Sequence, residues 1–520
     1  MTRDQDRYYV TTPIYYVNDV PHIGHAYTTL ACDVLARFMR LDGRDVHFLT
    51  GTDEHGQKVE KSARKAGVEP QQFTDEVSEN FRALARQMNY SNDDFIRTTE
   101  PRHKEAVQAI WKALVASGDI YLGSYSGWYA VRDEAFYNED ELTRDEEGRM
   151  IAPSGAEAEW LEEPSYFFRL SRWQEPLLKF YEENPDFIGP ESRRNEVISF
   201  VRGGLRDLSV SRTTFNWGIP VPDDPEHVVY VWLDALTNYI TAVGYPDTDC
   251  ASFRKYWPAD VHMVGKDILR FHAVYWPAFL MAAGLPLPRR IYAHGWLMNR
   301  GEKMSKSLGN VLRPQDLVES YGLDPVRYYL LREVPFGSDG YISHETMVAR
   351  LNGDLANDLG NLAQRVLSMI HKNCDASVPA PGEYHSSDRV LLDKAAGVLQ
   401  TVRQEFSQQT FHRGLEAIWQ IVGDANRYVD EQAPWVLRKT DRERMGTVLY
   451  VLADTVRRLA LMIQPVMPDA MSRLLDQLNV SGEQRSFAYL EAGLQPGEVL
   501  PKPEGIFPRY IEPEESQKTS

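Results

Sequence analysis

Residues 8–40 read YYVTTPIYYVNDVPHIGHAYTTLACDVLARFMR and combine a β-rich beginning with an amphipathic end. Residues 8–12 favour a strand, and residues 26–40 carry apolar side chains at helical spacing. The next segment repeats this order, because a strand over 46–49 leads into the polar loop GTDEHG at 51–56 and then into a polar helix. Strands that alternate with helices predict a parallel sheet, in which ligands bind beyond the carboxyl ends of the strands.

This pattern is interrupted between residues 121 and 224, where short aromatic, glycine-rich and acidic segments follow one another. Strand patterns return at 228–232, 261–265 and 291–295. After Pro335 we expect no further strands, and residues 354–373 and 389–409 have helical periodicity.

The sequence therefore predicts an α/β protein, with a Rossmann-like parallel sheet catalytic domain split by an inserted connective domain and followed by an all-helical domain. The expected boundaries are 1–120 and 225–298 for the two halves of the catalytic domain, 121–224 for the insertion, 299–345 for a flexible lysine loop with a connecting unit, 346–500 for the helical domain and 501–520 for a polar, mobile tail.

The composition excludes several classes of protein. Of 520 residues 43% are hydrophobic, yet the longest apolar stretches fall short of the ~20 residues that a membrane span needs. The first ten residues lack the apolar run of a secretory signal, and the three cysteines are too far apart for a Cys-x-x-Cys pair. A net charge of -18 disfavours indiscriminate binding of polyanions, so a nucleic acid would have to meet local patches. We expect a cytoplasmic protein.

Two polar motifs carry candidate chemistry. Residues 21–25, Pro-His-Ile-Gly-His, lie where the first strand meets its helix, where imidazoles can neutralise phosphate and a glycine lets a purine approach the backbone. Residues 303–307, Lys-Met-Ser-Lys-Ser, place two ammonium groups on a glycine-flanked loop that can close over a triphosphate. Alone, the histidines are equally compatible with surface residues or a zinc pair, and the lysines with a solvated loop.

Together, in this order and on opposite halves of one split sheet, the motifs resemble the two signatures of class I aminoacyl-tRNA synthetases. From residue 8 to at least 435 the chain is similar to the methionyl-tRNA synthetases, whose motifs resemble GTDEHG at 51–56, YVWLDA at 230–235 and GKDI at 265–268. This resemblance implies ATP with Mg²⁺, L-methionine, and initiator and elongator tRNA(Met) as partners.

The resemblance also implies site residues. Catalysis would involve His22, His25, Lys303 and Lys306, and ATP would also meet Gly24, Gly265, Lys266, Asp267 and Ser305. The methionine pocket would be lined by Ile14, Tyr16, Trp232, Ala235, Leu236, Tyr239, Ile268 and His272, and Asp53 would hold the ammonium group. The anticodon would be contacted by Asn361, Arg365 and Trp435. A thioether gains from aromatic edges and a zwitterion needs a carboxylate partner, so the residue types agree.

Taken one at a time, these residues also fit blander roles: core packing for Trp232 and Tyr239, an ordinary loop for the Gly-Lys-Asp segment, and a helix cap with a core tryptophan for Asn361 and Trp435. The insertion departs from many relatives, because no cysteine lies between Cys32 and Cys250. We therefore expect no zinc, an insertion held by its aromatic residues (Trp128, Tyr129, Trp160, Phe167 and Phe168), and a monomer.

Three rival functions remain. A synthetase for a branched amino acid usually carries a larger editing insertion than residues 121–224 can form, and a nucleotidyltransferase without tRNA has no use for the helical region. The intact histidines and lysines argue against a catalytically silent RNA-binding paralogue.

Overall fold

A computed structural model describes residues 6–17, 20–133, 135–299, 302–303 and 312–512, and the chain divides into two compact units. One unit comprises residues 1–32 and 46–294, and the other comprises residues 33–45 and 295–520. Helix α1 (Ile23–Leu41) therefore contributes its first half to one unit and its second half to the other.

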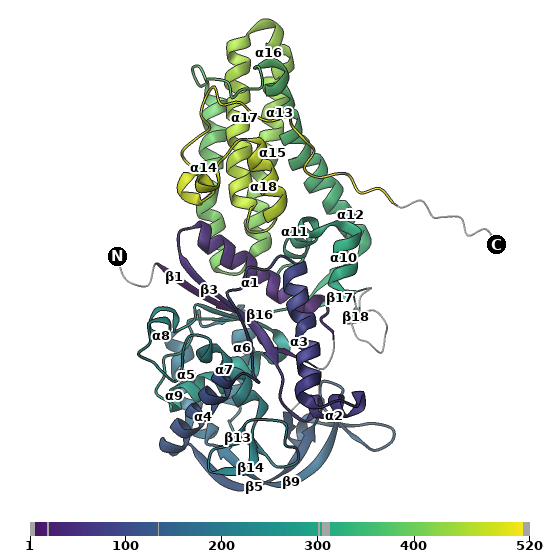
Figure 1. Ribbon diagram of the computed structural model, residues 1–520, viewed down its shortest axis with the longest axis vertical. Coiled ribbons are helices and arrows are strands. Elements are labelled where there is room, and N and C mark those ends of the chain that lie inside the picture. The colour runs from purple at the N-terminus through teal and green to yellow at the C-terminus, as the bar shows by residue number, and fades with distance from the viewer. Residues whose placement is uncertain (1–5, 18–19, 134, 300–301, 304–311, 513–520) are drawn as a thin grey trace, which may run out of the picture. The chain divides into compact units, whose positions relative to one another are not determined.

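A parallel sheet forms the centre of the first unit (Figure 1). Its strand order is β10-β16-β15-β1-β3, and β2 and β4 both pair with β3. The strands are β1 (Arg7–Thr11), β2 (Tyr15–Tyr16), β3 (Asp45–Asp53), β4 (Asp94–Arg97), β10 (Ile188–Gly189), β15 (Val261–Gly265) and β16 (Ile291–His294). The predicted parallel sheet is confirmed by the parallel registers of β1 with β15 and of β15 with β16.

The helices of this unit follow the predicted alternation. Helix α2 is capped at its C-terminus by Gly67, which adopts the left-handed conformation that a residue without Cβ takes easily. The apolar face of α4 packs against α7 and contributes Ile110, Trp111 and Leu114 to the main core. The helices are α2 (Gln57–Ala66), α3 (Pro70–Gln87), α4 (Pro101–Ala116), α5 (Gln174–Glu183), α6 (Glu191–Arg202), α7 (Val231–Thr241), α8 (Ala251–Tyr256) and α9 (Trp276–Ala282).

The smaller sheets of the inserted region are antiparallel and dominated by the long pair of strands β5 (Ile120–Ala130) and β9 (Glu157–Phe168), whereas β10 joins the parallel sheet. Short strands extend the antiparallel pair: β6 (Ala135–Tyr137), β7 (Thr143–Arg144), β8 (Met150–Ile151) and β11 (Leu208–Ser209). A separate sheet joins β12 (Ser211–Arg212), β14 (Asp224–Val229) and β13 (Pro220–Val221). The strand predicted over 228–232 is wrong in two respects, because β14 stops at Val229 and is antiparallel, and Val231 begins a helix.

The second unit contains a helical bundle built around α17 (Arg442–Ile463), most of whose side chains are buried. Helices α13, α14, α15, α16 and α18 pack against α17, and Figure 1 shows several of them running alongside it. The helices of the unit are α10 (Pro314–Tyr321), α11 (Leu323–Glu333), α12 (His344–Arg350), α13 (Asn361–Asn373), α14 (Ser386–Ser407), α15 (Phe411–Gln432), α16 (Pro434–Thr440) and α18 (Pro468–Gln477), with the π-helical η6 (Leu351–Gly360) before α13.

Two expectations for this unit are corrected. A strand does follow Pro335, because β19 (Gly340–Ile342) pairs in parallel with β17 (Leu297–Asn299). The segment from 501 to 512 is held in place: Gln477 exchanges two hydrogen bonds with the backbone of Glu504, and Asn352 exchanges two with the backbone of Tyr510. Amide side chains that pair with backbone groups order a polar segment without a large apolar core.

Candidate functional site

The order of the strands creates a binding edge in the sheet. From β1 the chain proceeds to β3 on one side, whereas β15 lies on the other side of β1 and continues to β16. The loops beyond β1 and β15 therefore diverge, and ligands bind at such a switch point in an open α/β sheet. The segment after β1 and β2 carries His22 just before α1 and His25 in its first turn, and the short 3-10 helix after β15 carries Asp267. Burial lowers the pKa of His22, and the negative charge of the nearby Asp267 carboxylate opposes this shift. The two predicted nucleotide-binding segments therefore lie near each other.

The two histidines form a stacked pair at the start of α1. Their ring centroids are 3.8 Å apart, with the planes 26° from parallel. Nδ1 of His25 accepts a hydrogen bond from the backbone N–H of His22 (3.1 Å), and Nδ1 of His22 accepts one from Gly24 (3.1 Å). In the neutral form each ring therefore carries its proton on Nε2, which is then a donor. Desolvation lowers the pKa of His22, and burial and the neighbouring His22 lower that of His25 well below its usual value. The pair consists of neutral donors.

Two glycines of the predicted nucleotide site are closely approached by side chains of their own segments. A Cβ on Gly24 would lie 2.9 Å from Cε1 of His22, so the stacked imidazole occupies the space of a side chain. A Cβ on Gly265 would lie 2.7 Å from Oδ1 of Asp267. The structure thus shows a steric reason for glycine at each position, and the predicted contacts of both residues with ATP stay a prediction.

The predicted methionine residues converge from three elements. Trp232, Ala235, Leu236 and Tyr239 occur at i, i+3, i+4 and i+7 of α7 and so share one face of that helix. Ile14 and Tyr16 come from the β1–β2 region, and both pack against the core that contains Leu236 and Tyr239. Ile268 and His272 come from the segment after β15 and are joined by a hydrogen bond from Nδ1 of His272 to the Ile268 carbonyl (2.9 Å).

Tyr239 and His272 form a polar pair among these apolar side chains. The Tyr239 hydroxyl lies 2.7 Å from Nε2 of His272. Because Nδ1 of His272 donates to a carbonyl, Nε2 of the neutral ring accepts a hydrogen bond from the Tyr239 hydroxyl. Burial lowers the pKa of His272 to about 4, so the ring is neutral at physiological pH. Trp232 stacks on Phe271 at 3.7 Å between centroids and meets the edge of His272. Aromatic faces around one hydroxyl–imidazole pair suit a polarizable thioether.

Asp53 ends strand β3, and Tyr16 of β2 is its register partner. The Asp53 side chain is buried, and its carbonyl accepts a hydrogen bond from Val17 (3.2 Å). The next residue but one, His55, contacts Asp234 of α7 through Nδ1 at 2.7 Å. The predicted ammonium partner is therefore tied to the helix that carries the predicted methionine residues.

The lysine motif falls largely outside the described residues. Lys303 belongs to strand β18 (Glu302–Lys303), where it is the register partner of Met298 in β17. Ser305 and Lys306 lie outside the described ranges, so their assignment rests on the sequence.

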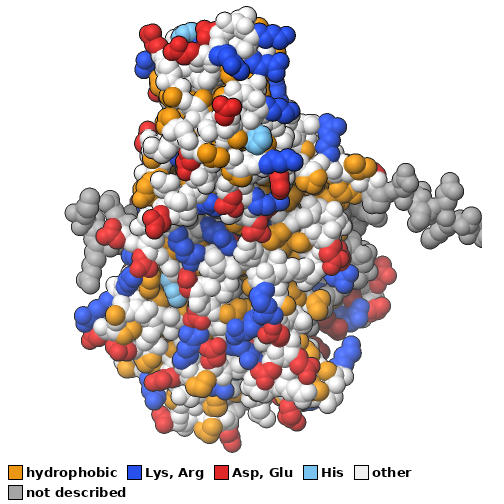
Figure 2. All heavy atoms as spheres, turned by 45° about the horizontal axis from the view of Figure 1, so that its top comes forward, with side chains coloured by type: hydrophobic (Ala, Val, Ile, Leu, Met, Phe, Trp, Pro, Cys, Tyr) orange, Lys and Arg blue, Asp and Glu red, His pale blue; other side chains and the backbone are white. Residues whose placement is uncertain are grey.

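The three predicted anticodon residues lie in the helical unit. Asn361 and Arg365 are one turn apart on α13, and the Arg365 guanidinium lies 5.5 Å from the centre of the Trp435 ring. An ion pair of 2.9 Å joins Arg365 to Asp430. Trp435 is 41% exposed, which is inconsistent with a core tryptophan. The exposed basic residues Arg438, Lys439 and Arg442 follow it in sequence, and Figure 2 shows Lys and Arg side chains gathered along one edge of the helical part.

The aromatic residues expected to hold the insertion do so in part, since Tyr129 packs against Phe136 and Phe167 stacks on Tyr121. Trp128 packs edge-on against Trp160, which is itself largely exposed, and Phe168 packs on Phe279 as part of the main core. The small core of the insertion is made by Met150 and four alanines, against which Trp128 packs. No group of three or more His, Cys, Asp or Glu side chains suited to a metal occurs among the residues that the structure describes.

Several side chains at the site were not predicted. Phe271 stacks on Trp232, and Asp234 is a fully buried carboxylate within the YVWLDA motif. Arg212, also fully buried, lies over the rings of Tyr129 and Tyr230. An acidic residue within an apolar helix is a sequence signal for Asp234, whereas no local pattern marks Arg212.

A parallel sheet with a switch point, paired histidines at the head of the helix beside it, and a separate helical unit define a class I aminoacyl-tRNA synthetase. Comparison with known proteins agrees: residues 8–367 match the family described as tRNA synthetases class I (M), and residues 378–519 match the anticodon binding domain of methionyl tRNA ligase.

The specific family follows from individual relatives. The chain is 58% identical to the methionine–tRNA ligase of Brucella suis over 98% of this chain and 99% of the relative, and 57% identical to that of Mycobacterium tuberculosis over 98% of each. The structure of the M. tuberculosis methionyl-tRNA synthetase with methionyl-adenylate superposes with a TM-score of 0.95 at 56% identity, covering 97% of this chain and all of the other. The chain belongs to the methionyl-tRNA synthetase family and is an enzyme of the methionine–tRNA ligase class.

Proposed function

We propose that the chain joins methionine to tRNA(Met) in two steps at the site described above. The methionine carboxylate attacks the α-phosphorus of Mg²⁺-bound ATP, forming methionyl-adenylate and releasing pyrophosphate. The terminal ribose hydroxyl of tRNA then attacks the acyl carbon and releases AMP. The observation that carries the proposal is the neutral Tyr239–His272 pair among stacked aromatic side chains, and the methionyl-adenylate in the similar M. tuberculosis enzyme supports it.

The nucleotide would be held by the residues around the switch point. The free Nε2–H groups of His22 and His25 donate to phosphate oxygens, and the stacked rings present them at the start of α1, where backbone N–H groups also favour anions. Gly24 and Gly265, where a Cβ would meet His22 and Asp267, would border the nucleotide, and Lys266 and Asp267 would supply a phosphate cation and a ribose acceptor. Lys303 and Lys306, with Ser305, stabilise the charge that moves onto pyrophosphate.

Methionine would be recognised at its two ends. The Tyr239–His272 pair and the aromatic rings of Trp232 and Phe271 surround the thioether. Asp53 pairs with the ammonium group, and no side chain acts as a nucleophile. Positioning and charge stabilisation therefore supply the catalysis.

RNA selection would take place on the helical unit. Trp435 stacks an unpaired base, while Arg365 and Asn361 hydrogen-bond base edges, as single-stranded RNA is commonly read.

We also propose that the protein is a cytoplasmic monomer without structural zinc. No described helix is long and apolar enough to cross a membrane.

Single-turnover kinetics test this scheme. Enzyme mixed with ATP and radiolabelled methionine should accumulate methionyl-adenylate, and tRNA(Met) added to the isolated complex should take up the label without further ATP. Label that never reaches tRNA from isolated complex would contradict the two-step scheme.

A further inference from the structure

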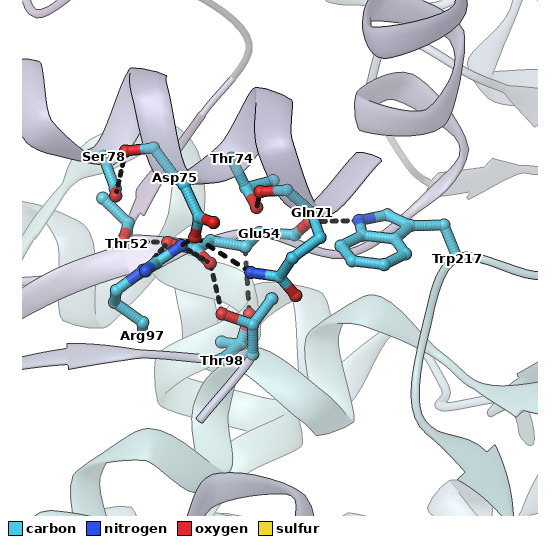
Figure 3. Close-up of polar contacts among 10 residues, drawn as sticks. Thr52, Glu54, Gln71, Thr74, Asp75, Ser78, Arg97, Thr98 and Trp217 are labelled. Atoms are coloured by element: carbon cyan, nitrogen blue, oxygen red, sulfur yellow. Dashed lines mark hydrogen bonds and ion pairs between the residues drawn. The ribbon is translucent and has the colours of Figure 1, made fainter. Parts of the chain in front are cut away.

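Each of the three residues that follow Asp53 is held by hydrogen bonds. The carboxylate of the first, Glu54, is fully buried and accepts two hydrogen bonds from Arg97 (2.7 and 2.9 Å) and one each from Thr52 (2.7 Å) and Thr99 (2.6 Å). The Glu54 backbone N–H donates to the Thr98 hydroxyl (3.0 Å). Figure 3 shows Arg97 and its neighbours converging on this carboxylate. Breaking such a buried pair leaves an uncompensated charge, so the position of Glu54 is strongly determined.

His55 is fixed by a second buried carboxylate. Asp234 accepts a hydrogen bond from Nδ1 of His55 through one oxygen and from Nε2 of His103 through the other, both at 2.7 Å. Burial alone raises the pKa of Asp234, but the two histidines lower it to about 2, so the carboxylate is ionised. The His55 carbonyl accepts a hydrogen bond from the Tyr16 hydroxyl (2.9 Å). His55 thus joins α7 to Tyr16.

Trp217, which lies between β12 and β13 in the sequence, bonds to the backbone of the residues on either side of His55. Its indole Nε1–H donates to the Glu54 carbonyl (2.6 Å), and its own carbonyl accepts from the Gly56 N–H (2.9 Å). Its ring meets His55 edge-on, with centroids 5.5 Å apart (Figure 3 shows the indole and Glu54). The inserted region therefore bonds directly to both sides of His55.

These contacts are more than a loop connecting β3 to α2 needs, because two buried carboxylates, those of Glu54 and Asp234, and the indole of Trp217 hold the three residues after Asp53. Ligand-binding side chains must be held within about 0.5 Å of their productive position, and neighbouring side chains that are themselves fully bonded provide this. We propose that Glu54 and His55, with their partners Arg97, Asp234 and Trp217, form a clamp that positions the Asp53 carboxylate for the ammonium group of methionine. The inference rests on the proposed role of Asp53, and it assigns the clamp members as positioning residues.

Binding of three ligands distinguishes a role of the clamp in positioning Asp53 from a general effect on the stability of the protein. Methionine and its amino alcohol both carry the ammonium group, whereas the des-amino acid, 4-(methylthio)butanoate, lacks it. Equilibrium binding of each ligand is measured on the full chain, together with the melting temperature. Because the clamp acts through Asp53, only ligands with the ammonium group should respond to its loss.

His55→Ala removes the bond to Asp234. We expect the dissociation constants of methionine and its amino alcohol to rise roughly 10- to 100-fold, the effect of one charge-assisted hydrogen bond, while that of the des-amino acid stays near wild type. His55→Asn, whose amide can donate from near the position of Nδ1, should restore part of the loss. His103→Ala is the matched control, because it removes the other bond to the same carboxylate from α4, away from the loop.

The inference is overturned if His55→Ala weakens all three ligands equally, or if His103→Ala gives the same ammonium-selective loss. Should His55→Ala fail to fold, Trp217→Phe gives the same readout, since it removes only the indole donor and keeps an aromatic ring. The Asp53→Asn variant distinguishes an error in the clamp inference from an error in the proposed role of Asp53. If Asp53→Asn leaves the preference for the ammonium ligands intact, the role of Asp53 is wrong; if it abolishes that preference while His55 and Trp217 variants keep it, only the clamp is wrong.

Discussion

Replacing Trp435 with alanine separates RNA recognition from amino-acid activation. The side chain is 41% exposed and lies on the short helix α16, so the buried core of the helical unit does not depend on it. The neighbouring Arg365 keeps its ion pair with Asp430 in the variant. Trp435→Ala should therefore leave the fold of the helical unit unchanged, together with the adenylate-forming chemistry proposed for the other unit.

The expected loss in tRNA charging follows from the contacts that the indole makes. Stacking of an unpaired base on an aromatic ring contributes ~1–3 kcal/mol, which corresponds to roughly 5- to 150-fold in binding. The guanidinium 5.5 Å from the ring centre loses the π-face against which it lies, so base-edge contacts by Arg365 weaken as well. The loss is larger if anticodon docking also orients the acceptor end.

Two assays on the same protein test this prediction: ATP–pyrophosphate exchange and methionylation of tRNA(Met). We expect exchange near wild type and methionylation reduced by the factor above, in kcat/KM for tRNA. Val436→Ala is the control, because Val436 is 51% exposed on the same helix but offers no ring. A parallel fall in both activities, or loss of helical circular dichroism, would refute the anticodon assignment of Trp435.

Further predictions concern the lysine loop, metal content and pH. Lys306→Ala should lower ATP–pyrophosphate exchange by orders of magnitude and leave the dissociation constant of methionine nearly unchanged, because the loop acts on migrating phosphate charge; equal losses would make it structural. Elemental analysis of purified protein should find no stoichiometric zinc, and one tightly held zinc per chain would contradict the metal-free insertion. Burial raises the pKa of Asp324 to about 6, so its ionisation destabilises the folded state as pH rises from about 4 through 6, by up to about 3 kcal/mol. Asp324→Asn should therefore gain melting temperature relative to wild type between pH 5 and pH 7.5, and a difference that is independent of pH would show that Asp324 is not protonated at the lower pH.

Local periodicity was sufficient for the parallel sheet but not for α7. Residues 228–232 combine β-branched and aromatic side chains, which favour a strand by local preference. The chain nevertheless turns helical at Val231, because helical spacing places Trp232, Ala235, Leu236 and Tyr239 on one face against the core. Strand β19 is only three residues long, too short for alternation to identify.

The placement of the candidate site residues was predictable where they lie in contiguous motifs, and not where their position depends on pairing between distant parts of the sequence. The histidine, GTDEHG and GKDI segments stood out because polar residues follow buried strands. Asp234 bonds to His55 and His103, which are 179 and 131 residues away in sequence, and no periodicity reveals such a pairing. The neutral state of His22 and His25 likewise depends on burial that only the folded chain shows.

Amino-acid-dependent ATP–pyrophosphate exchange, measured with each of the twenty amino acids, tests the assignment to methionine most directly. Because the Tyr239–His272 pair and the surrounding rings suit a thioether, methionine should have the highest kcat/KM of the set. Branched apolar amino acids should exchange far more slowly. Faster exchange with any other amino acid, or exchange that does not depend on an amino acid, would contradict the assignment.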